Sequence, residues 1–248
     1  MERGRRTLSP HEAAITAMFT ALVCIATISF TIYVPQTKGF FNIGEAMVYI
    51  TALLFGPAIG AVSGGVGSML ADLILGYSHY APATLIIKGF EGGIVGLLTR
   101  KRPKIASERE WKIVTSIMGV FLGAALGIIG ATYYSGSVEL YLGLSTEQST
   151  AILNVPFYVW YILGGLAASA IILSGLLVEP ELGWTVISII LGGSIMVAGY
   201  FLYEQFLLGV LAYAEVPVNI GQMTIGLIVS IPVVRGIYRY LPSLREKY

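Results

Sequence analysis

The sequence predicts an all-α membrane protein, a polytopic bundle of about eight transmembrane helices with both termini in the cytoplasm. Of its 248 residues, 56% are apolar and only 12% are charged, whereas soluble domains carry about 25% charged residues. The apolar residues form long runs rather than short alternating ones. Because lipid leaves backbone groups to be satisfied internally, such runs favour helices over a barrel. The basic residues, finally, gather on one side of the resulting topology.

A spanning helix needs about 20 largely apolar residues. Charged residues, prolines and glycines divide the chain into candidate spans at 13–34, 44–56, 57–76, 83–99, 111–134, 150–178, 184–208 and 217–237. The second candidate is short. Gly56 and Pro57 predict the turn after it, because proline disfavours helix at the preceding residue and starts a helix well.

The basic residues predict the orientation, since cytoplasmic loops are enriched in lysine and arginine. Eight spans put both termini and the 100–112 connection on one side. That side collects Arg3, Arg5, Arg6, Arg100, Lys101, Arg102, Lys104, Arg109, Lys112, Arg235, Arg239, Arg245 and Lys247. Only Lys38 and Lys88 remain elsewhere. We therefore expect cytoplasmic termini.

Buried and interfacial polar residues fall toward the opposite, outer ends of these spans. Two of them, Lys88 and Glu91, share one helix face at a spacing of three residues, and Asp72 could reach Lys88 across a short loop. Charged side chains inside a membrane normally face a cavity or one another. Lys88 and Glu91 therefore form either a structural ion pair or part of an outward-open pocket for a small polar or aromatic molecule.

Several kinds of chemistry have no matching motif. His11 and His79 are isolated, and the single cysteine, Cys24, excludes a disulfide within one chain. The glycines at 60–67 lack the Gly-Lys-Ser/Thr that would bind a nucleotide phosphate. Together with the Gly-xxx-Gly spacings at 119–127, they predict close helix contacts instead. We expect no enzyme activity, no cofactor, no metal and no nucleic-acid partner.

The first candidate span carries an alanine strip, Ala13, Ala17 and Ala21, at four-residue spacing. Small residues one turn apart let another helix lie close. The strip predicts a helix contact, either within this chain or with a partner.

The chain resembles the substrate-binding S components of energy-coupling factor (ECF) transporters, in particular the riboflavin-transporter-like branch. The resemblance is carried by the alanine strip and by three blocks of sequence: NIGEAMVYITALLFGPAIGAVSGGVGSMLADLILGYSHYAPATLIIKGFEGGIVGLL (42–98), GGSIMVAGYFLYEQ (192–205) and EVPVNIGQ (215–222). The resemblance covers roughly 10–104 and 184–240. It implies a multi-pass prokaryotic cell-membrane protein that captures a vitamin or related micronutrient from outside. Ala13, Ala17 and Ala21 would dock on a transmembrane T component driven by two ABC-type ATPases.

Members of the family usually have six helices, which would correspond here to helices 1–4 (10–104) and the last two helices (184–240). Residues 105–183 would then be an additional helical hairpin between them. We expect all of these helices to form one transmembrane domain (1–248). A weak repeat at an offset of 73 residues, from Trp111 to Trp184 and from Gly119 to Gly192, fits either duplication of a hairpin or chance similarity between glycine-rich helices. Which of the two hairpins lines the pocket stays open, although the second matches the family better.

The predicted substrate-binding residues combine these polar positions from four regions of the chain. They are Asn42, Glu45, Asp72, Tyr80, Lys88, Glu91, Tyr200, Glu204, Asn219 and Gln222. Three alternatives remain: a stand-alone ion-coupled secondary transporter, an intramembrane enzyme and a purely structural subunit. Riboflavin, thiamine-pathway pyrimidines and pyridoxine are all compatible ligands.

Overall fold

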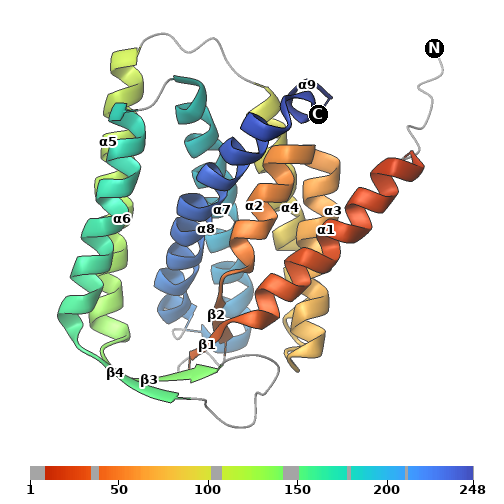
Figure 1. The fold of residues 1–248 in the computed structure, drawn as a ribbon. Helices are drawn as coiled ribbons and strands as arrows, with labels where there is room; N and C mark the ends of the chain where they lie inside the picture. The colour runs from red at the N-terminus through yellow and green to blue at the C-terminus, as the bar shows by residue number, and fades with distance from the viewer. Residues whose placement is uncertain are drawn as a thin grey trace.

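A computed structural model describes residues 9–34, 39–101, 108–141, 151–177, 180–209 and 212–247. Its elements confirm the predicted all-α membrane class (Figure 1). The helices are α1 (Pro10–Ser29), α2 (Gly44–Phe55), α3 (Pro57–Ile74), α4 (Ala81–Arg100), α5 (Glu108–Tyr133), α6 (Phe157–Leu177), α7 (Pro180–Leu208), α8 (Ala212–Tyr240) and α9 (Pro242–Lys247). The strands are β1 (Thr31–Val34), β2 (Gly39–Asn42), β3 (Gly136–Tyr141) and β4 (Ala151–Val155).

A helix stands at each of the eight predicted positions. In the described ranges, six helices are long and apolar enough to cross a membrane, and Gly44–Phe55 and Phe157–Leu173 are shorter apolar helices. The start of α1, the ends of α4 and α8 and the start of α5 lie at one end of the bundle (Figure 1), so the described basic residues gather there as predicted. Arg3, Arg5, Arg6, Lys38, Arg102 and Lys104 lie outside the described residues. The cytoplasmic assignment of this basic end stays a prediction.

Two predicted boundaries are wrong, because a small antiparallel sheet replaces helix there. The sheet has the order β2-β1-β3-β4 and lies at the end opposite the termini (Figure 1). The first candidate span was extended to residue 34, yet α1 ends at Ser29, and Thr31 pairs with Asn42 in β2. The sixth was started at 150, where Ala151–Val155 instead pairs with β3. Hydropathy alone did not separate these β-branched and aromatic residues, which favour strands, from the helices beside them.

The short helix α2 is the centre of the bundle. Eleven of its twelve residues are buried, and it packs against α1, α3, α4 and α8. A helix that is apolar all round belongs inside a protein. Gly56, at φ +80°, makes the predicted turn into α3. Arg100 Nη2 donates a 2.7 Å hydrogen bond to the carbonyl of Phe55 and so caps the end of α2.

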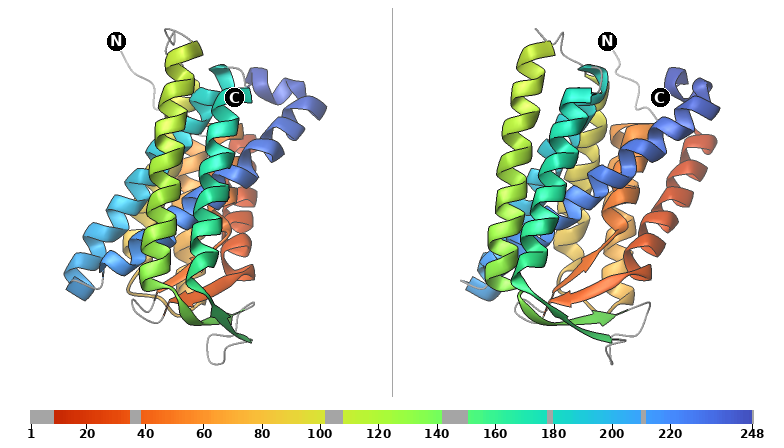
Figure 2. Two further views of the ribbon diagram at one scale, coloured as in Figure 1. Left: turned by 90° about the vertical axis from the view of Figure 1, so that its left-hand side faces the viewer. Right: turned by 60° about the vertical axis from the view of Figure 1, so that its left-hand side comes forward.

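Glycines bring neighbouring helices into close contact, as the Gly-xxx-Gly spacings predicted. A Cβ atom at Gly60 of α3 would lie 2.9 Å from the Gly92 carbonyl of α4. Similarly, one at Gly119 of α5 would lie 3.0 Å from the Ala168 carbonyl of α6. The resulting α5–α6 hairpin stands to one side of the other helices (Figure 2).

Candidate binding site

A polar pocket opens at the sheet end of the bundle, between β2, α2, α3, α4, α7 and α8. Its lining residues are Thr27, Gly39, Phe40, Asn42, Glu45, Ser68, Asp72, Tyr80, Thr84, Lys88, Tyr200, Glu204, Glu215, Asn219 and Gln222. The cavity has a volume of about 50 Å³. The pocket is therefore narrow in this conformation, and a vitamin-sized ligand would have to widen it.

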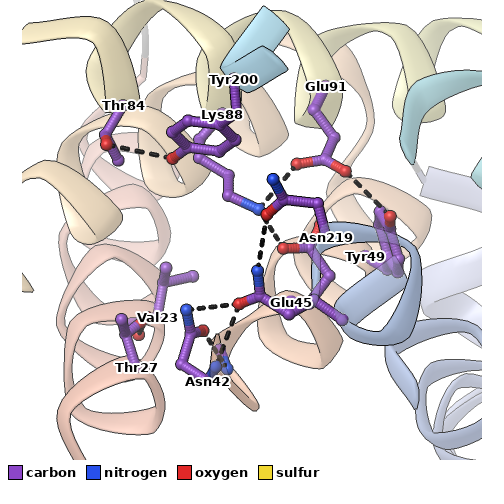
Figure 3. A network of polar contacts seen from close by, with 12 residues as sticks. Val23, Thr27, Asn42, Glu45, Tyr49, Thr84, Lys88, Glu91, Tyr200 and Asn219 are labelled. Carbon is purple, nitrogen blue, oxygen red and sulfur yellow. Dashed lines mark hydrogen bonds and ion pairs between the residues drawn. The ribbon is translucent and has the colours of Figure 1, made fainter. Parts of the chain in front are cut away.

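Lys88 of α4 is the centre of the charged part of the site. Its ammonium group forms ion pairs with Glu45 of α2 and, at 3.1 Å, with Glu91 Oε2 one turn further along α4. The Tyr49 hydroxyl donates a 2.8 Å hydrogen bond to Glu91 Oε1, and Figure 3 shows these four side chains together. All four are at least 95% buried. Since a buried charge needs a partner, the network ties α2 to α4.

The structure contains the ion pair predicted for Lys88 and adds a second partner that the sequence did not predict. The Lys88–Glu91 ion pair is confirmed, but the second partner of Lys88 is Glu45. Within the described residues, the ion pairs of Lys88 are with these two carboxylates. Asp72 interacts with Lys88 only through space. It comes from the outer half of α3 and lines the same pocket.

Three amide side chains join β2 to α8 at another wall of the pocket. Asn42 Nδ2 and the Asn42 backbone amide donate to Gln222 Oε1 at 2.6 and 3.1 Å. Gln222 Nε2 donates to Asn219 Oδ1 at 2.9 Å. Asn42 Oδ1 accepts a hydrogen bond from the Gly44 amide at the first turn of α2. The loop after α1 is thus fixed against the last helix.

Tyrosines from α7 and from the α3–α4 connection form the aromatic part of the site. Tyr200 donates a 3.0 Å hydrogen bond to Thr84 Oγ1, and its ring lies 5.8 Å from the Lys88 ammonium. The rings of Tyr80 and Tyr203 pack edge to face, 5.7 Å apart. Burial, together with the nearby Glu204, raises the pKa of Tyr80, so this hydroxyl keeps its proton. These rings provide flat surfaces on which a heteroaromatic ligand can stack.

Two further carboxylates lie at the ends of α7 and α8 near the sheet. Glu204 of α7 is 1% exposed and Glu215 of α8 is 4% exposed. They interact electrostatically with each other and with Tyr80. Glu204 Oε2, Asp72 Oδ2 and the Tyr80 hydroxyl are buried and make no hydrogen bond of good geometry in the described structure. Tyr80 nevertheless lies beside Glu204, and Thr84 lies beside Asp72, so each carboxylate has a hydroxyl donor next to it.

The structure brings nine of the ten predicted residues to the pocket wall, and Glu91 stands behind Lys88. Sequence reasoning missed Thr27, Gly39, Phe40, Ser68, Thr84 and Glu215. Glu215 had a usable signal, because it lies four residues before Asn219 and so shares its helix face. Ser68 and Thr84 had the same signal, because they lie four residues before Asp72 and Lys88 on their helices. None of the described lining residues comes from α5 or α6. Asn154, a polar residue on β4 directly before α6, is exposed.

Within the described residues, the alanine strip makes no internal helix contact. Ala13, Ala17 and Ala21 are all exposed, whereas the opposite face of α1 carries the buried residues Phe19 and Val23. Gly67 of α3 approaches that opposite face, since a Cβ atom at Gly67 would lie 2.7 Å from the Thr20 carbonyl. The strip is therefore left free for a neighbour outside the described chain.

Comparisons with known proteins agree with the membrane-protein fold. The model of the family described as ECF-type riboflavin transporter, S component, matches residues 7–179, which include α1 to α6. A Pyrococcus woesei protein, described as uncharacterized in a gap 3′ region, is 38% identical over 119 residues, 48% of this chain and 73% of that protein. The thiamine precursor transporter HmpT of Lactococcus lactis subsp. cremoris is 33% identical over 91 residues, 36% of this chain and 55% of that protein.

Proposed function

Because the chain belongs to the family of ECF-type riboflavin transporter S components, we propose that it captures a vitamin or related micronutrient at the outer face of a prokaryotic cell membrane. The observation that carries the proposal is the buried polar pocket at the end of the bundle opposite the basic residues. A ligand that enters there meets charged, amide and aromatic groups from five helices and β2. Such a set of groups recognises a small heteroaromatic molecule.

Delivery inward is proposed to need a T component and two ATPase subunits. The exposed alanine strip on α1 supports this part, because it offers a smooth face on which a partner helix can lie. The chain acts as a binding and translocation module, not as an enzyme. The thiamine precursor transporter among its relatives supports a vitamin or vitamin precursor as the cargo.

Replacing Ala17 with tryptophan tests the partner surface. The bulky ring should abolish co-purification with a co-expressed T component and stop uptake, while ligand binding by the purified chain stays unchanged. Ala124→Trp is the matched control, since Ala124 is an exposed alanine on α5. Loss of ligand binding together with partner binding would mean that the strip supports the fold of this chain.

A second measurement separates this proposal from stand-alone transport. Liposomes that contain the chain alone should bind the ligand but accumulate none of it, with or without an imposed ion gradient. Gradient-driven accumulation would contradict the proposal and favour an ion-coupled secondary transporter.

A further inference from the structure

A second, larger cavity lies between the α5–α6 hairpin and the rest of the bundle. Its volume is about 370 Å³, against about 50 Å³ for the polar pocket. Its wall is mainly apolar and comes from α5, α7 and α8, with side chains that include Phe121, Leu122, Phe201, Val216, Ile220 and Met223. Among the described lining residues, Ser194 and Tyr213 are the polar ones.

The cavity is a gap at the edge of the apolar core. Within the hairpin, α5 and α6 pack closely, since a Cβ atom at Gly123 would collide with the Gly164 carbonyl. Between the hairpin and α7 and α8, by contrast, space is left. Leu122, Ile220 and Met223 line this space and also belong to the main core. Because interiors are close-packed and side chains beside an empty gap lose dispersion contacts, an apolar occupant is favoured here.

The position of the cavity indicates what can enter it. Its three helices are all long and apolar enough to cross a membrane, and its lining runs from Ser194, in the middle of α7, to Tyr213, near the sheet. From Tyr213 to Met223, α8 rises about 15 Å, half of a hydrocarbon layer about 30 Å thick. Phe121 and Tyr213 are 70% and 54% exposed, so the cavity opens sideways. Ordered water needs about two to four polar partners, whereas the bilayer supplies hydrocarbon at this depth.

We propose that a hydrocarbon chain of a membrane lipid occupies this cavity, as a binding site separate from the polar pocket. The exposed Tyr213 lies at the end of the cavity near the sheet, where an aromatic side chain with a hydroxyl suits the level of the headgroups. A partner helix does not fit, because a helix 15 Å long and 10–12 Å across takes up roughly 1,200–1,700 Å³. This is several times the volume of the cavity.

Helix α8 separates the two cavities, so an occupant of one supports the wall of the other. Asn219 lines the polar pocket, and its neighbour Ile220 lines the apolar cavity. Pro217 lies inside α8 and cannot donate the helix hydrogen bond that the carbonyl of Tyr213 would accept. The first turns of α8 therefore depend more on side-chain packing. A lipid chain supports them from behind the pocket.

Native mass spectrometry of the full chain in detergent, titrated with dioleoylphosphatidylglycerol, tests the site. We expect one lipid to stay bound under collisional activation that removes the others. Ser194→Phe should lower the lipid-bound fraction at least about tenfold, because the ring takes up the inner end of the cavity. Ser169→Phe is the matched control, since Ser169 is an exposed serine in the middle of α6 outside the described lining. Equal retention by both variants, or no lipid retained by the unaltered chain, would overturn the proposal.

Amide hydrogen exchange tests the support of α8. Adding the same lipid should slow exchange in residues 213–223 of the unaltered chain and of Ser169→Phe, but not of Ser194→Phe. Ala198→Leu fills the same cavity by a smaller change and should give the same result if Ser194→Phe does not fold. Equal slowing throughout the chain in every variant would mean general stabilisation by lipid and would contradict the inference. A dimer that is lost in Ser194→Phe would assign the cavity to contact between two copies instead.

Discussion

At the scale of single residues, the bundle depends on one buried lysine. Lys88 forms ion pairs with both Glu45 and Glu91, which are 1% and 0% exposed. Both carboxylates stand on helices that also form the pocket wall. The same lysine therefore lines the pocket and holds α2 against α4. A structural ion pair and a pocket residue, the two roles that the sequence allowed for Lys88, are thus compatible.

Replacing Lys88 with methionine should destabilise the protein severely. The change keeps most of the side-chain volume but leaves two buried carboxylates without a positive partner, which costs about 3–5 kcal/mol. A thermal unfolding curve in detergent should show a much lower midpoint, while Lys101→Met, at an exposed lysine of the basic end, should leave the midpoint unchanged. Equal midpoints for both variants would mean that the buried carboxylates do not depend on Lys88.

The sequence predicted most pocket residues because ionisable and amide groups are conspicuous among apolar residues. Lys88 and Glu91 also sit on one helix face, so their pairing followed from spacing. The partnership of Lys88 with Glu45 did not, since it depends on how α2 lies across α4. Thr27 carries no comparable signal, because small hydroxyl residues are common in any membrane helix.

At the scale of helices and strands, glycines set how closely α3 and α4 approach. Gly60 and Gly92 face each other, and a side chain on either would collide with the backbone opposite. This contact sets how closely the two helices that carry Asp72 and Lys88 approach each other. The arrangement of the pocket therefore depends on residues that never touch it.

A leucine at Gly92 should force these two helices apart. Overpacking costs about 1–3 kcal/mol and more against backbone atoms, so Gly92→Leu should reduce the folded, monodisperse fraction in size-exclusion chromatography. Gly165→Leu is a suitable control, because a Cβ atom at this exposed glycine of α6 meets nothing within 4 Å. Normal yield of the Gly92 variant would show that α3 and α4 can separate at little cost.

Helix positions were predictable, because long apolar runs and the Gly56-Pro57 turn mark them locally. The sheet was not, since each strand is short and gains its stability from a partner far away in the sequence. Thr31 pairs with both Asn42 and Tyr141. No local sequence pattern predicts the pairing with Tyr141. The strands also adjoin apolar helices, so hydropathy merged them with the spans.

At the scale of the whole molecule, the pocket and the basic residues at the ends of the helices lie at opposite ends of the bundle. The helices α1–α4, α7 and α8 surround the pocket, and we propose that they form the core to which the α5–α6 hairpin is added. The family match nevertheless runs over 7–179 and stops before α7, whereas Tyr200, Glu204, Asn219 and Gln222 lie beyond it. The division into a core and an added hairpin stays a prediction.

Cysteine labelling tests the orientation of the molecule. Cys24 is buried, so it should react little with a membrane-impermeant maleimide. A cysteine in place of the exposed Ser78, near the sheet, should react in intact cells. One in place of Lys101, at the basic end, should react only after the cells are permeabilised, because basic loops stay in the cytoplasm. The reverse pattern would invert the proposed topology.

The short helix α2 also fixes how far a captured molecule has to travel. Its first turn carries Glu45 in the pocket wall, and its last residue, Phe55, is capped by Arg100 at the basic end. Twelve residues rise about 18 Å, whereas the hydrocarbon layer is about 30 Å thick. In the proposed orientation, a ligand beside Glu45 would therefore lie well below the outer boundary of the bilayer, with little more than half of the crossing still ahead of it.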